Sequence, residues 1–527
     1  MKKYIPLDIN AIKNIGIENW QKSYYWPISD KSYTKLIDKL WDEFDKMYID
    51  SNYDLKNILL SDTKFISFMS SYLHCNIVKS IGENENYDIL SGKLSEVYLN
   101  PDWRLLGDSN KVSVNLVNRH KLKAKGWVKR LIHNNHLGLF KNLMNFFRIS
   151  SVWSIGSTSQ IKKTYVKEHG CYCNYQYIES IIPKSVHCID SPDIDILSKK
   201  IQKFVTNISL FCENNFDFSL PLDDIKECWV SRLTHMMQIY RYAQVIKHIP
   251  EKLLLTEVAK PLHKIIALAF QSKGCQVIGF SHGNDVGNLN RRLQGYNEYA
   301  QCDLYICPTE KSKELRGFEY SGNKLSDERV TTFQSIELKL YKDIFDLNKI
   351  EQPVDYVRTV MIIGYPMNTI RYQYSAGDFF YFQLDLEIKL AKLLNKNGYR
   401  VIYKVHPDRA DSVKGIFDDI VDEILVTPFE KTYQFADAIV FGCLTSTTFG
   451  YAVNTNKPIY LLDIEGQFWN KGVRKLLQKR CTMVTSFFDK SNRIIFDEDY
   501  IIDKLKEKQF QPNYEYVEKL MFPMSNS

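Results

Sequence analysis

In the stretch VIGFSHGNDVGN, residues 277–288, a histidine and an acid follow a short apolar run. Gly283 and Gly287 would allow a tight turn and a close approach of a substrate to the backbone. The imidazole of His282 titrates near neutral pH and can accept a proton, and Asp285 is a second candidate for this task. The stretch therefore predicts a strand that carries a general base on a glycine-rich turn. The alternative for His282 is a buried, hydrogen-bonded side chain.

Cationic side chains follow a second apolar run at residues 401–409, VIYKVHPDR. Lys404, His406 and Arg409 lie within six positions of one another, and Pro407 ends the strand and fixes the turn. Several hydrogen-bond donors at the end of one strand suit a phosphate group. The stretch predicts a phosphate site, and a surface turn with a capping histidine is the alternative.

Hydroxyl side chains form a third cluster at Thr445, Ser446 and Thr447, between the apolar runs AIVFG and KPIYLLD. Such residues cap helices, and the free N–H groups of a helix N-terminus bind anions. Simple capping is the alternative. Because ligands of open α/β sheets bind beyond the carboxyl ends of the strands, we expect this cluster and His406 to lie on one edge. Together they predict a cradle for a diphosphate or a phosphodiester.

Alternating helix and strand patterns surround these clusters. Residues 261–280 predict a helix that begins at proline, ends at Gly274 and leads into a strand, and residues 359–463 predict a second series of this kind. Such units build parallel sheets, so the predicted fold is α/β, GT-B type, with two Rossmann-like domains facing across a cleft. SIGSTS at residues 154–159 is predicted to be a strand-terminal turn or part of an acceptor pocket.

The chain length predicts two domains, since 527 residues exceed what one core usually serves. A polar stretch predicts a linker or a domain crossing near residues 330–356. We therefore expect an acceptor-side domain at residues 1–335, with added N-terminal helices such as the amphipathic pattern at residues 30–50. Residues 336–527 would form the nucleotide-donor domain, and its last helix could pack back on the first domain.

Composition excludes several classes of protein. The 69 Lys and Arg against 62 Asp and Glu give a net charge of +7, which is no signature of nucleic-acid binding. The N-terminus lacks the apolar segment of a secretory signal, and no apolar run approaches the roughly 20 residues of a membrane helix. The 11 scattered cysteines predict free thiols in a reducing cytoplasm.

Two patterns that could bind a metal are better explained otherwise. Asp193 and Asp195 form an Asp-x-Asp pair, but proline flanks it and the sequence predicts an acidic turn in a loop. A group of histidines and cysteines lacks the paired spacing of a zinc site and predicts buried thiols instead. The group comprises His169, Cys171, Cys173, His187 and Cys188. We expect neither a metal nor a cofactor.

The three clusters, in this order over roughly residues 250–465, resemble motifs of GT-B glycosyltransferases of bacterial surface polysaccharide synthesis. They are similar to capsule Kdo transferases, which carry Gln-His-Gly and then His-Pro. They are also similar to CDP-glycerol glycerophosphotransferases of teichoic acid synthesis, which carry Trp-His-Gly, Lys-x-His-Pro and a serine cluster. This chain departs from both, because Ser281 replaces Gln or Trp and Thr-Ser-Thr-Thr replaces the serine-rich run.

The resemblance implies roles for these residues. His282, or its rival Asp285, would deprotonate the acceptor on the turn at Gly283. The donor phosphate would be held by the second and third clusters, namely Lys404, His406, Pro407, Arg409, Thr445, Ser446 and Thr447.

The resemblance also implies substrates and a location. The donor would be a CMP-activated ulosonic acid such as Kdo, and the acceptor a lipid-linked glycan or surface polysaccharide of the capsule or lipopolysaccharide kind. Two alternatives remain: a CDP-glycerol-dependent glycerophosphotransferase and a non-catalytic polysaccharide-assembly protein. The expected location is the cytoplasm, at the inner face of the plasma membrane as a peripheral protein.

Overall fold

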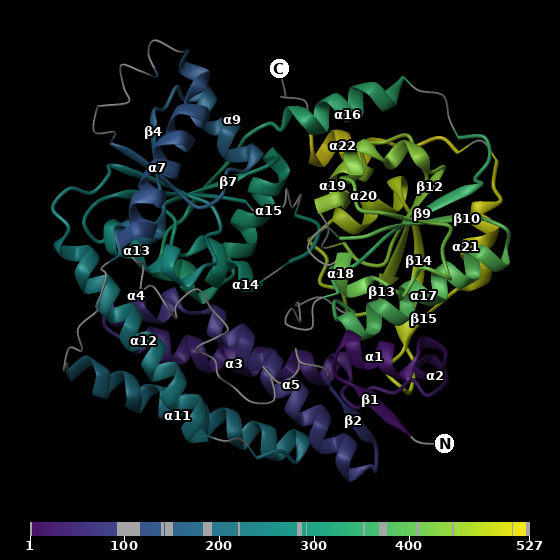
Figure 1. Cartoon of the computed structure of the whole chain (residues 1–527), viewed down its shortest axis with the longest axis horizontal. Helices are drawn as coiled ribbons and strands as arrows, with labels where there is room; N and C mark the ends of the chain where they lie inside the picture. The colour runs from purple at the N-terminus through teal and green to yellow at the C-terminus, as the bar shows by residue number, and fades with distance from the viewer. Residues whose placement is uncertain are drawn as a thin grey trace.

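Two parallel sheets with helices on both faces form the body of the molecule (Figure 1). The predicted α/β class is thereby confirmed. The computed structural model describes residues 3–91, 116–138, 142, 151–182, 192–219, 222–281, 287–290, 292–350, 354–367, 377–406, 410–444, 447–508 and 510–522.

The first sheet has six parallel strands in the order β4-β3-β5-β6-β7-β8. Its first strand in the chain, β3, lies between β4 and β5, so the strand order reverses beside β3. Ligands of open α/β sheets bind at such a reversal. The strands are β3 (Val152–Ile155), β4 (Cys173–Gln176), β5 (Lys252–Leu255), β6 (Gln276–Phe280), β7 (Leu304–Cys307) and β8 (Thr332–Ser335).

The second sheet has seven strands in the order β11-β10-β9-β12-β13-β14-β15, all parallel except β15. Here β10 and β12 flank β9, so the order reverses beside β9, as in the Rossmann arrangement. The predicted series of strands after residue 359 is confirmed. The strands are β9 (Thr359–Ile363), β10 (Arg400–Lys404), β11 (Glu423–Leu425), β12 (Ala438–Phe441), β13 (Ile459–Ile464), β14 (Thr482–Phe488) and β15 (Ile494–Phe496).

The connecting helices follow local signals in the sequence. The helix α13 has Pro261 in its first turn, and Gly274, with a φ of 89°, lets the chain turn back into β6. The helices after the N-terminal region are α7 (Leu116–His133), α9 (Gln160–Glu168), α10 (Ile178–Ile181), α11 (Pro192–Phe216), α12 (Leu222–Val245), α13 (Pro261–Gln271), α14 (Arg292–Gln294), α15 (Glu310–Ser321), α16 (Lys339–Lys349), α17 (Phe380–Lys396), α18 (Ala410–Val413), α19 (Thr447–Ala452), α20 (Val473–Arg480), α21 (Glu498–Leu505) and α22 (Glu515–Leu520). Short helical turns are η2 (Asn135–Leu137), η3 (Gly295–Tyr299), η4 (Lys324–Asp327), η6 (Phe429–Lys431) and η7 (Tyr433–Phe435).

The described residues before position 92 form five helices, and the amphipathic pattern at residues 30–50 is confirmed as one of them, α3. The side chain of Ser29 caps α3 by accepting from the N–H of Ser32. A short parallel pair, β1 (Tyr4–Pro6) and β2 (Asp88–Leu90), flanks this region. The helices are α1 (Ile9–Ile15), α2 (Ile17–Lys22), α3 (Asp30–Ile49), α4 (Tyr53–Ser61) and α5 (Lys64–Asn84).

This N-terminal region contacts both sheet units. Trp20 and Trp26 are fully buried, and their rings lie 5.2 and 4.4 Å from the ring of Tyr381 in α17, beside the second sheet. On the other side, Asp62 accepts two hydrogen bonds of 2.6 and 2.7 Å from the buried Arg232 of α12. One hydrophobic cluster therefore runs from the N-terminal helices into both sheets.

Two sequence expectations about loops need revision. Residues 330–356 lead from β8 of the first sheet toward the second, but they also hold α16, which buries Tyr341 against α19 and the nearby chain. The expected loop at Asp193 and Asp195 is wrong, because both lie in the first turn of α11. Acids stabilise this end of a helix, and Asp193 forms an ion pair of 2.9 Å with Arg241.

Candidate functional site

The carboxyl ends of β9, β10 and β12 lie at one edge of the second sheet. Lys404 at the end of β10 pairs with Ile363 of β9, and Ile363 pairs with Phe441 of β12. Neighbouring strands are about 4.8 Å apart, so Lys404 and Phe441 are separated by roughly 10 Å. The chain after β12 leads to Thr447, the first residue of α19. The structure thus places Lys404, His406 and Thr447 at the edge where the strand order reverses.

The Lys404 side chain is buried at this edge. Its Nζ donates to the carbonyl of Val405 at 2.8 Å. Burial lowers the pKa of Lys404, and the carboxylate of Glu430 opposes that shift. His406 is half-buried two residues later, and Thr447 is exposed. Among the described residues the Lys404 ammonium has one carbonyl partner, which leaves donors for an anion.

Several predicted site residues lie outside the described residues. They are His282, Gly283 and Asp285 of the first cluster, Pro407 and Arg409 of the second, and Thr445 and Ser446 of the third. The chain on either side of the first cluster is placed, however. The N–H of Ser281 donates to the carbonyl of Ile306 at 3.0 Å directly after β6, and Gly287 resumes the chain.

The segment Gly287–Asn290 contacts the loop that follows β13 in the second sheet. The N–H of Asn290 donates to the carbonyl of Phe468 at 2.7 Å, and the N–H of Asn470 donates to the carbonyl of Asn288 at 3.0 Å. The Asn470 side chain also donates to the carbonyl of Gly287 at 2.7 Å. The carboxyl end of β6 and the carboxyl end of β13 therefore lead into one contact between the two sheet units.

Two buried side chains reinforce this contact. Arg316 of α15 donates to the carbonyl of Leu289 at 3.0 Å. Tyr516 of α22 donates its hydroxyl proton to Asn288, and α22 contacts α15. The C-terminal helix thus helps to fix the chain that follows the first cluster.

A buried carboxyl group of α17 contacts the ends of β9 and β10 at this edge of the second sheet. Glu387 of α17 is 1% exposed, and its two oxygens accept from the N–H of Tyr365 and the hydroxyl of Tyr403, each at 2.7 Å. Burial raises the pKa of Glu387 to about 8, although both hydrogen bonds act to lower it. The carboxyl group joins the turn after β9 to the end of β10.

Glycines allow close packing at the ends of β9 and β12. A Cβ at Gly364, directly after β9, would lie 2.5 Å from the hydroxyl of Tyr403 in β10. A Cβ at Gly442, directly after β12, would lie 2.7 Å from Oε1 of Gln383 in α17. A larger residue at position 364 would displace the Tyr403 ring, and one at position 442 would push α17 away from the edge.

The first sheet has a comparable edge at its own strand reversal, within SIGSTS. Gly156, with a φ of 86°, turns the chain from β3 toward α9, and a Cβ there would lie 2.5 Å from the carbonyl of Thr256. The ammonium of Lys162 in α9 is fully buried and donates to Oγ1 of Thr256 at 3.4 Å. Burial lowers the pKa of Lys162 to about 7. The Thr256 hydroxyl in turn donates to the carbonyl of Ser157 at 2.6 Å.

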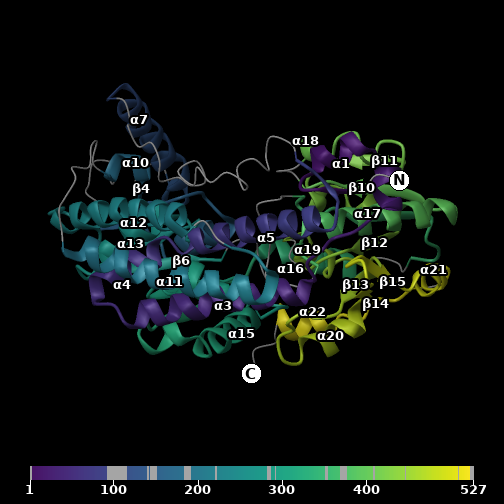
Figure 2. The same cartoon turned by 90° about the horizontal axis from the view of Figure 1, so that it is seen from below.

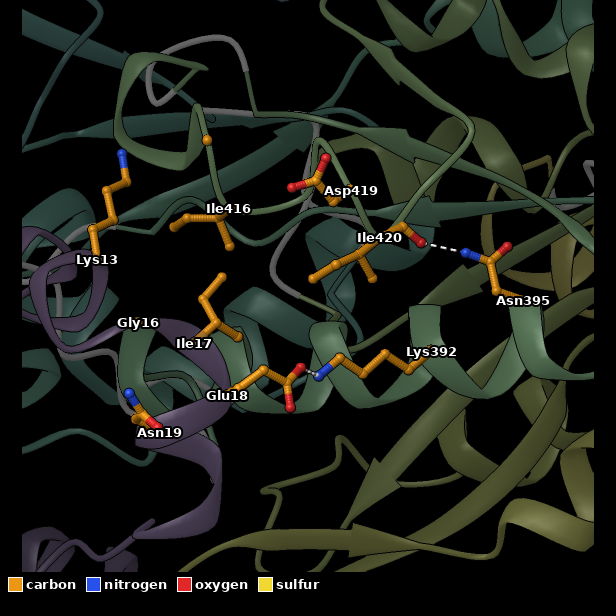
Figure 3. Close-up of a pocket in the computed structure, with 11 residues that line it drawn as sticks. Lys13, Gly16, Ile17, Glu18, Asn19, Lys392, Asn395, Ile416, Asp419 and Ile420 are labelled. Atoms are coloured by element: carbon orange, nitrogen blue, oxygen red, sulfur yellow. Dashed lines mark hydrogen bonds and ion pairs between the residues drawn. The ribbon is translucent and has the colours of Figure 1, made fainter.

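A groove of about 660 Å³ lies between the N-terminal helices and the second sheet unit (Figure 3). Lys392 and Asn395 line it from the last turns of α17, which lead toward the amino end of β10. Glu18 forms an ion pair with Lys392 across the groove, as Figure 3 shows. The groove is therefore at the opposite edge of the sheet from Lys404.

Metal ligands do not gather in the part of the chain that the structure describes, where no three His, Cys, Asp or Glu side chains form a group. Ten cysteines are described and all are free thiols, as predicted. Cys173 is buried, and burial raises its pKa to about 12. His187 and Cys188 of the predicted thiol group lie outside the described residues. Among the helices of the described ranges, none has an apolar stretch of sufficient length to cross a bilayer.

Sequence reasoning missed Glu387 and Lys162, although a signal was present. Glu387 lies three residues after Leu384 and four before Ala391, on the apolar stripe of its helix. Lys162 likewise lies three residues before Tyr165, which is buried. A charged residue inside an apolar stripe is a signal for a buried polar contact.

Comparison with known proteins yields no relative. The sequence matches no model of a known protein family, and a search of curated proteins finds no match. The functional argument therefore rests on the motifs and on the geometry of the two sheet edges.

Proposed function

We propose that this protein is a GT-B glycosyltransferase that moves a sugar from a nucleotide donor to a bacterial surface glycan or its lipid-linked precursor. The observation that carries the proposal is the contact between Gly287–Asn290 and Phe468–Asn470. It brings the chain after β6 to the chain after β13, so that a ligand at one sheet edge can meet a ligand at the other. Lys404 and His406 at the carboxyl ends of the strands of the second sheet also support the proposal, because the side chains of a site, and not the fold alone, decide function.

The donor is assigned to the edge of the second sheet. Lys404 and His406 hold the phosphate in this proposal, with Arg409 and the hydroxyl groups of Thr445, Ser446 and Thr447 as further donors. Charge develops on this phosphate as the donor bond breaks, and fixed donors stabilise it. Glu387 holds the turn after β9 and the end of β10 in place, which is the support that such a preorganised site requires.

The acceptor is assigned to the edge of the first sheet. His282 or Asp285 takes the proton of an acceptor hydroxyl, and the oxygen attacks the anomeric carbon of the donor. The new C–O bond forms as the bond to the phosphate oxygen breaks, and its electron pair leaves with the nucleotide. Glycine at position 283 has no Cβ to obstruct this approach. The motifs favour a CMP-activated ulosonic acid as the donor.

Binding of nucleotides tests the proposal. The thermal shift of the full chain would be measured with CMP, CDP, UDP, GDP and ADP. A ligand at a hundred times its Kd stabilises the protein by about 2.7 kcal/mol. We expect CMP to stabilise the wild type and the control His248→Ala, which removes an exposed histidine, and to stabilise His406→Ala much less.

The outcomes separate the candidate functions. Stabilisation by CDP alone, with a glycerophosphate mass added to the acceptor, would replace the sugar donor by CDP-glycerol. Stabilisation by none of the five nucleotides would contradict the proposal and favour a non-catalytic assembly protein. Equal stabilisation of the wild type and His406→Ala would remove the phosphate role of His406.

A further inference from the structure

The helix α7 (Leu116–His133) carries cationic residues and no acidic one. Over 18 residues its cations are Arg119, Lys121, Lys123, Lys125, Lys129 and Arg130. Such a charge excess on one helix is costly unless the helix faces water or an anionic partner. The helix is therefore a candidate interaction surface.

One face of α7 packs on the edge strand β4 of the first sheet. A Cβ at Gly126 would lie 3.3 Å from the carbonyl of Tyr175, so the helix approaches the strand closely. Arg130 is buried on the same face, and its Nε donates to the hydroxyl of Tyr172 at 2.7 Å. This face anchors α7 to the sheet.

The opposite face of α7 exposes large apolar side chains to solvent. Four side chains with helical spacing form this surface, which we call the α7 apolar face. They are Trp127, Val128, Leu131 and Ile132, with exposed fractions of 60%, 55%, 38% and 63%. Figure 2 shows α7 projecting away from the body of the molecule. Clustered exposure of this kind marks an interaction site rather than chance.

Lysines border the α7 apolar face. Lys125 is exposed, and Lys129 is half-buried with its ammonium 4.8 Å from the centre of the Tyr177 ring. At 100° per residue, both lie beside Ile132 on the helix surface. An apolar face bordered by lysines is the pattern of a helix that lies in the plane of a membrane interface.

We propose that α7 docks this protein on an anionic lipid bilayer, with the α7 apolar face in the interface and the lysines at the headgroups. Charge decides between the possible occupants. A second copy of this cationic helix would be repelled, and a nucleic acid offers no apolar layer for Val128 and Ile132. Anionic lipid supplies both negative charge and hydrocarbon, and each lysine near such a surface adds to the attraction.

The position of α7 determines which side of the molecule would face the bilayer. Tyr177, which Lys129 covers, follows directly after the carboxyl end of β4. The docked bilayer would thus lie beside the edge of the first sheet to which the acceptor is assigned above. The docking itself does not depend on that assignment, because lipid binding is measured without donor or acceptor.

Vesicle co-sedimentation of the full chain tests the proposal. The vesicles would be phosphatidylglycerol mixed with phosphatidylcholine, and phosphatidylcholine alone. We expect binding to the anionic vesicles that weakens as salt is raised. Trp127→Ser/Ile132→Ser and Lys125→Gln/Lys129→Gln should each lower the partition coefficient roughly tenfold.

Matched controls replace equally exposed residues elsewhere. Phe318→Ser removes an aromatic side chain that is 70% exposed on α15, and Lys396→Gln/Lys506→Gln removes two exposed lysines. These variants should bind vesicles as the wild type does. Far-UV circular dichroism and thermal unfolding would verify that all variants are folded.

Five results would overturn the proposal. The wild type could fail to bind anionic vesicles, it could bind both vesicle types equally, or the α7 variants could bind as well as their controls. Concentration-dependent dimerisation that is lost in Trp127→Ser, without vesicle binding, would assign the face to a second copy of the chain instead. Retention on RNA rather than lipid would also contradict it.

Discussion

The two sheets bury ionisable side chains of opposite kinds at equivalent places, an acid in the second sheet and a base in the first. In each sheet the helix after the first strand of the chain buries an ionisable side chain near the reversal of strand order, Glu387 in α17 and Lys162 in α9. Burial drives both toward the neutral form, with a pKa of about 8 for Glu387 and about 7 for Lys162. The same fold position therefore supports two edges of different chemistry.

The two groups differ in how firmly they are bound. Glu387 accepts two hydrogen bonds of 2.7 Å, one from the backbone of Tyr365 and one from Tyr403. Among the described residues, Lys162 donates one hydrogen bond, of 3.4 Å, to Thr256. An ammonium has three donors, so Lys162 keeps hydrogen-bonding capacity, while both carboxyl oxygens of Glu387 are used for support. Under the proposed function, a rigid edge would suit the donor phosphate, and an adaptable one would suit a variable acceptor.

Removing the Glu387 carboxyl group should produce the largest change in stability. Glu387→Ala leaves the N–H of Tyr365 and the hydroxyl of Tyr403 without their acceptor and opens a cavity. We expect a loss of roughly 3 kcal/mol in the free energy of unfolding. Urea denaturation at neutral pH measures this loss. Unchanged stability would mean that Glu387 does not hold the edge.

The ionisation of Glu387 should make the stability of the wild type depend on pH, which tests the comparison between the two sheets. Its folded pKa of about 8 exceeds the usual 4.5, so the carboxyl favours folding below pH 4.5 and this benefit is lost as the pH rises through 8. Glu387→Gln cannot ionise, and its amide can replace the hydrogen bonds once the Tyr403 hydroxyl reorients. The variant should equal the wild type near pH 5 and exceed it by about 2 kcal/mol near pH 9. Urea midpoints across this range measure the difference, and a constant difference would contradict the assigned pKa.

Lys162 should show the opposite pH dependence. Its folded pKa of about 7 is below the usual 10.5, so its contribution to stability is present above pH 10.5 and is lost as the pH falls through 7. Lys162→Met should therefore exceed the wild type by about 1 to 2 kcal/mol at pH 6 and equal it near pH 10. The same urea titration measures it. A gain that does not shrink at high pH would point to packing rather than charge.

Glycine replacement should give the smallest effect. Gly364→Ala brings a Cβ to 2.5 Å from the Tyr403 hydroxyl, and the ring must shift. We expect a cost of about 1 kcal/mol. The control Gly317→Ala lies in α15 with its nearest neighbour 3.7 Å away, and alanine there should stabilise the helix by a few tenths of a kcal/mol. Melting temperatures compare the two, and equal shifts would argue against close packing at Gly364.

Local signals in the sequence predicted the strands and turns well. The apolar run that follows Gly274 and the one that precedes the Lys-x-His stretch are short-range patterns, and the structure has β6 and β10 at these places. Asp193 was misplaced because its proline neighbour suits a helix start as well as a loop. The apolar stripes around Glu387 and Lys162 indicate that both side chains are buried, but residue spacing does not identify their partners Tyr403 and Thr256. The same is true of the N-terminal helices, whose partners lie in both halves of the chain.

The burial of Trp20 and Trp26 against Tyr381 also constrains how the protein is made. The hydroxyl of Tyr381 donates to the carbonyl of Tyr25 at 3.0 Å, a contact between residues 356 positions apart. During translation these tryptophans emerge long before α17 exists, so they stay uncovered on the ribosome for most of synthesis. The nascent chain therefore cannot complete its first segment in order, and a truncated product that lacks α17 would expose indole rings and invite aggregation.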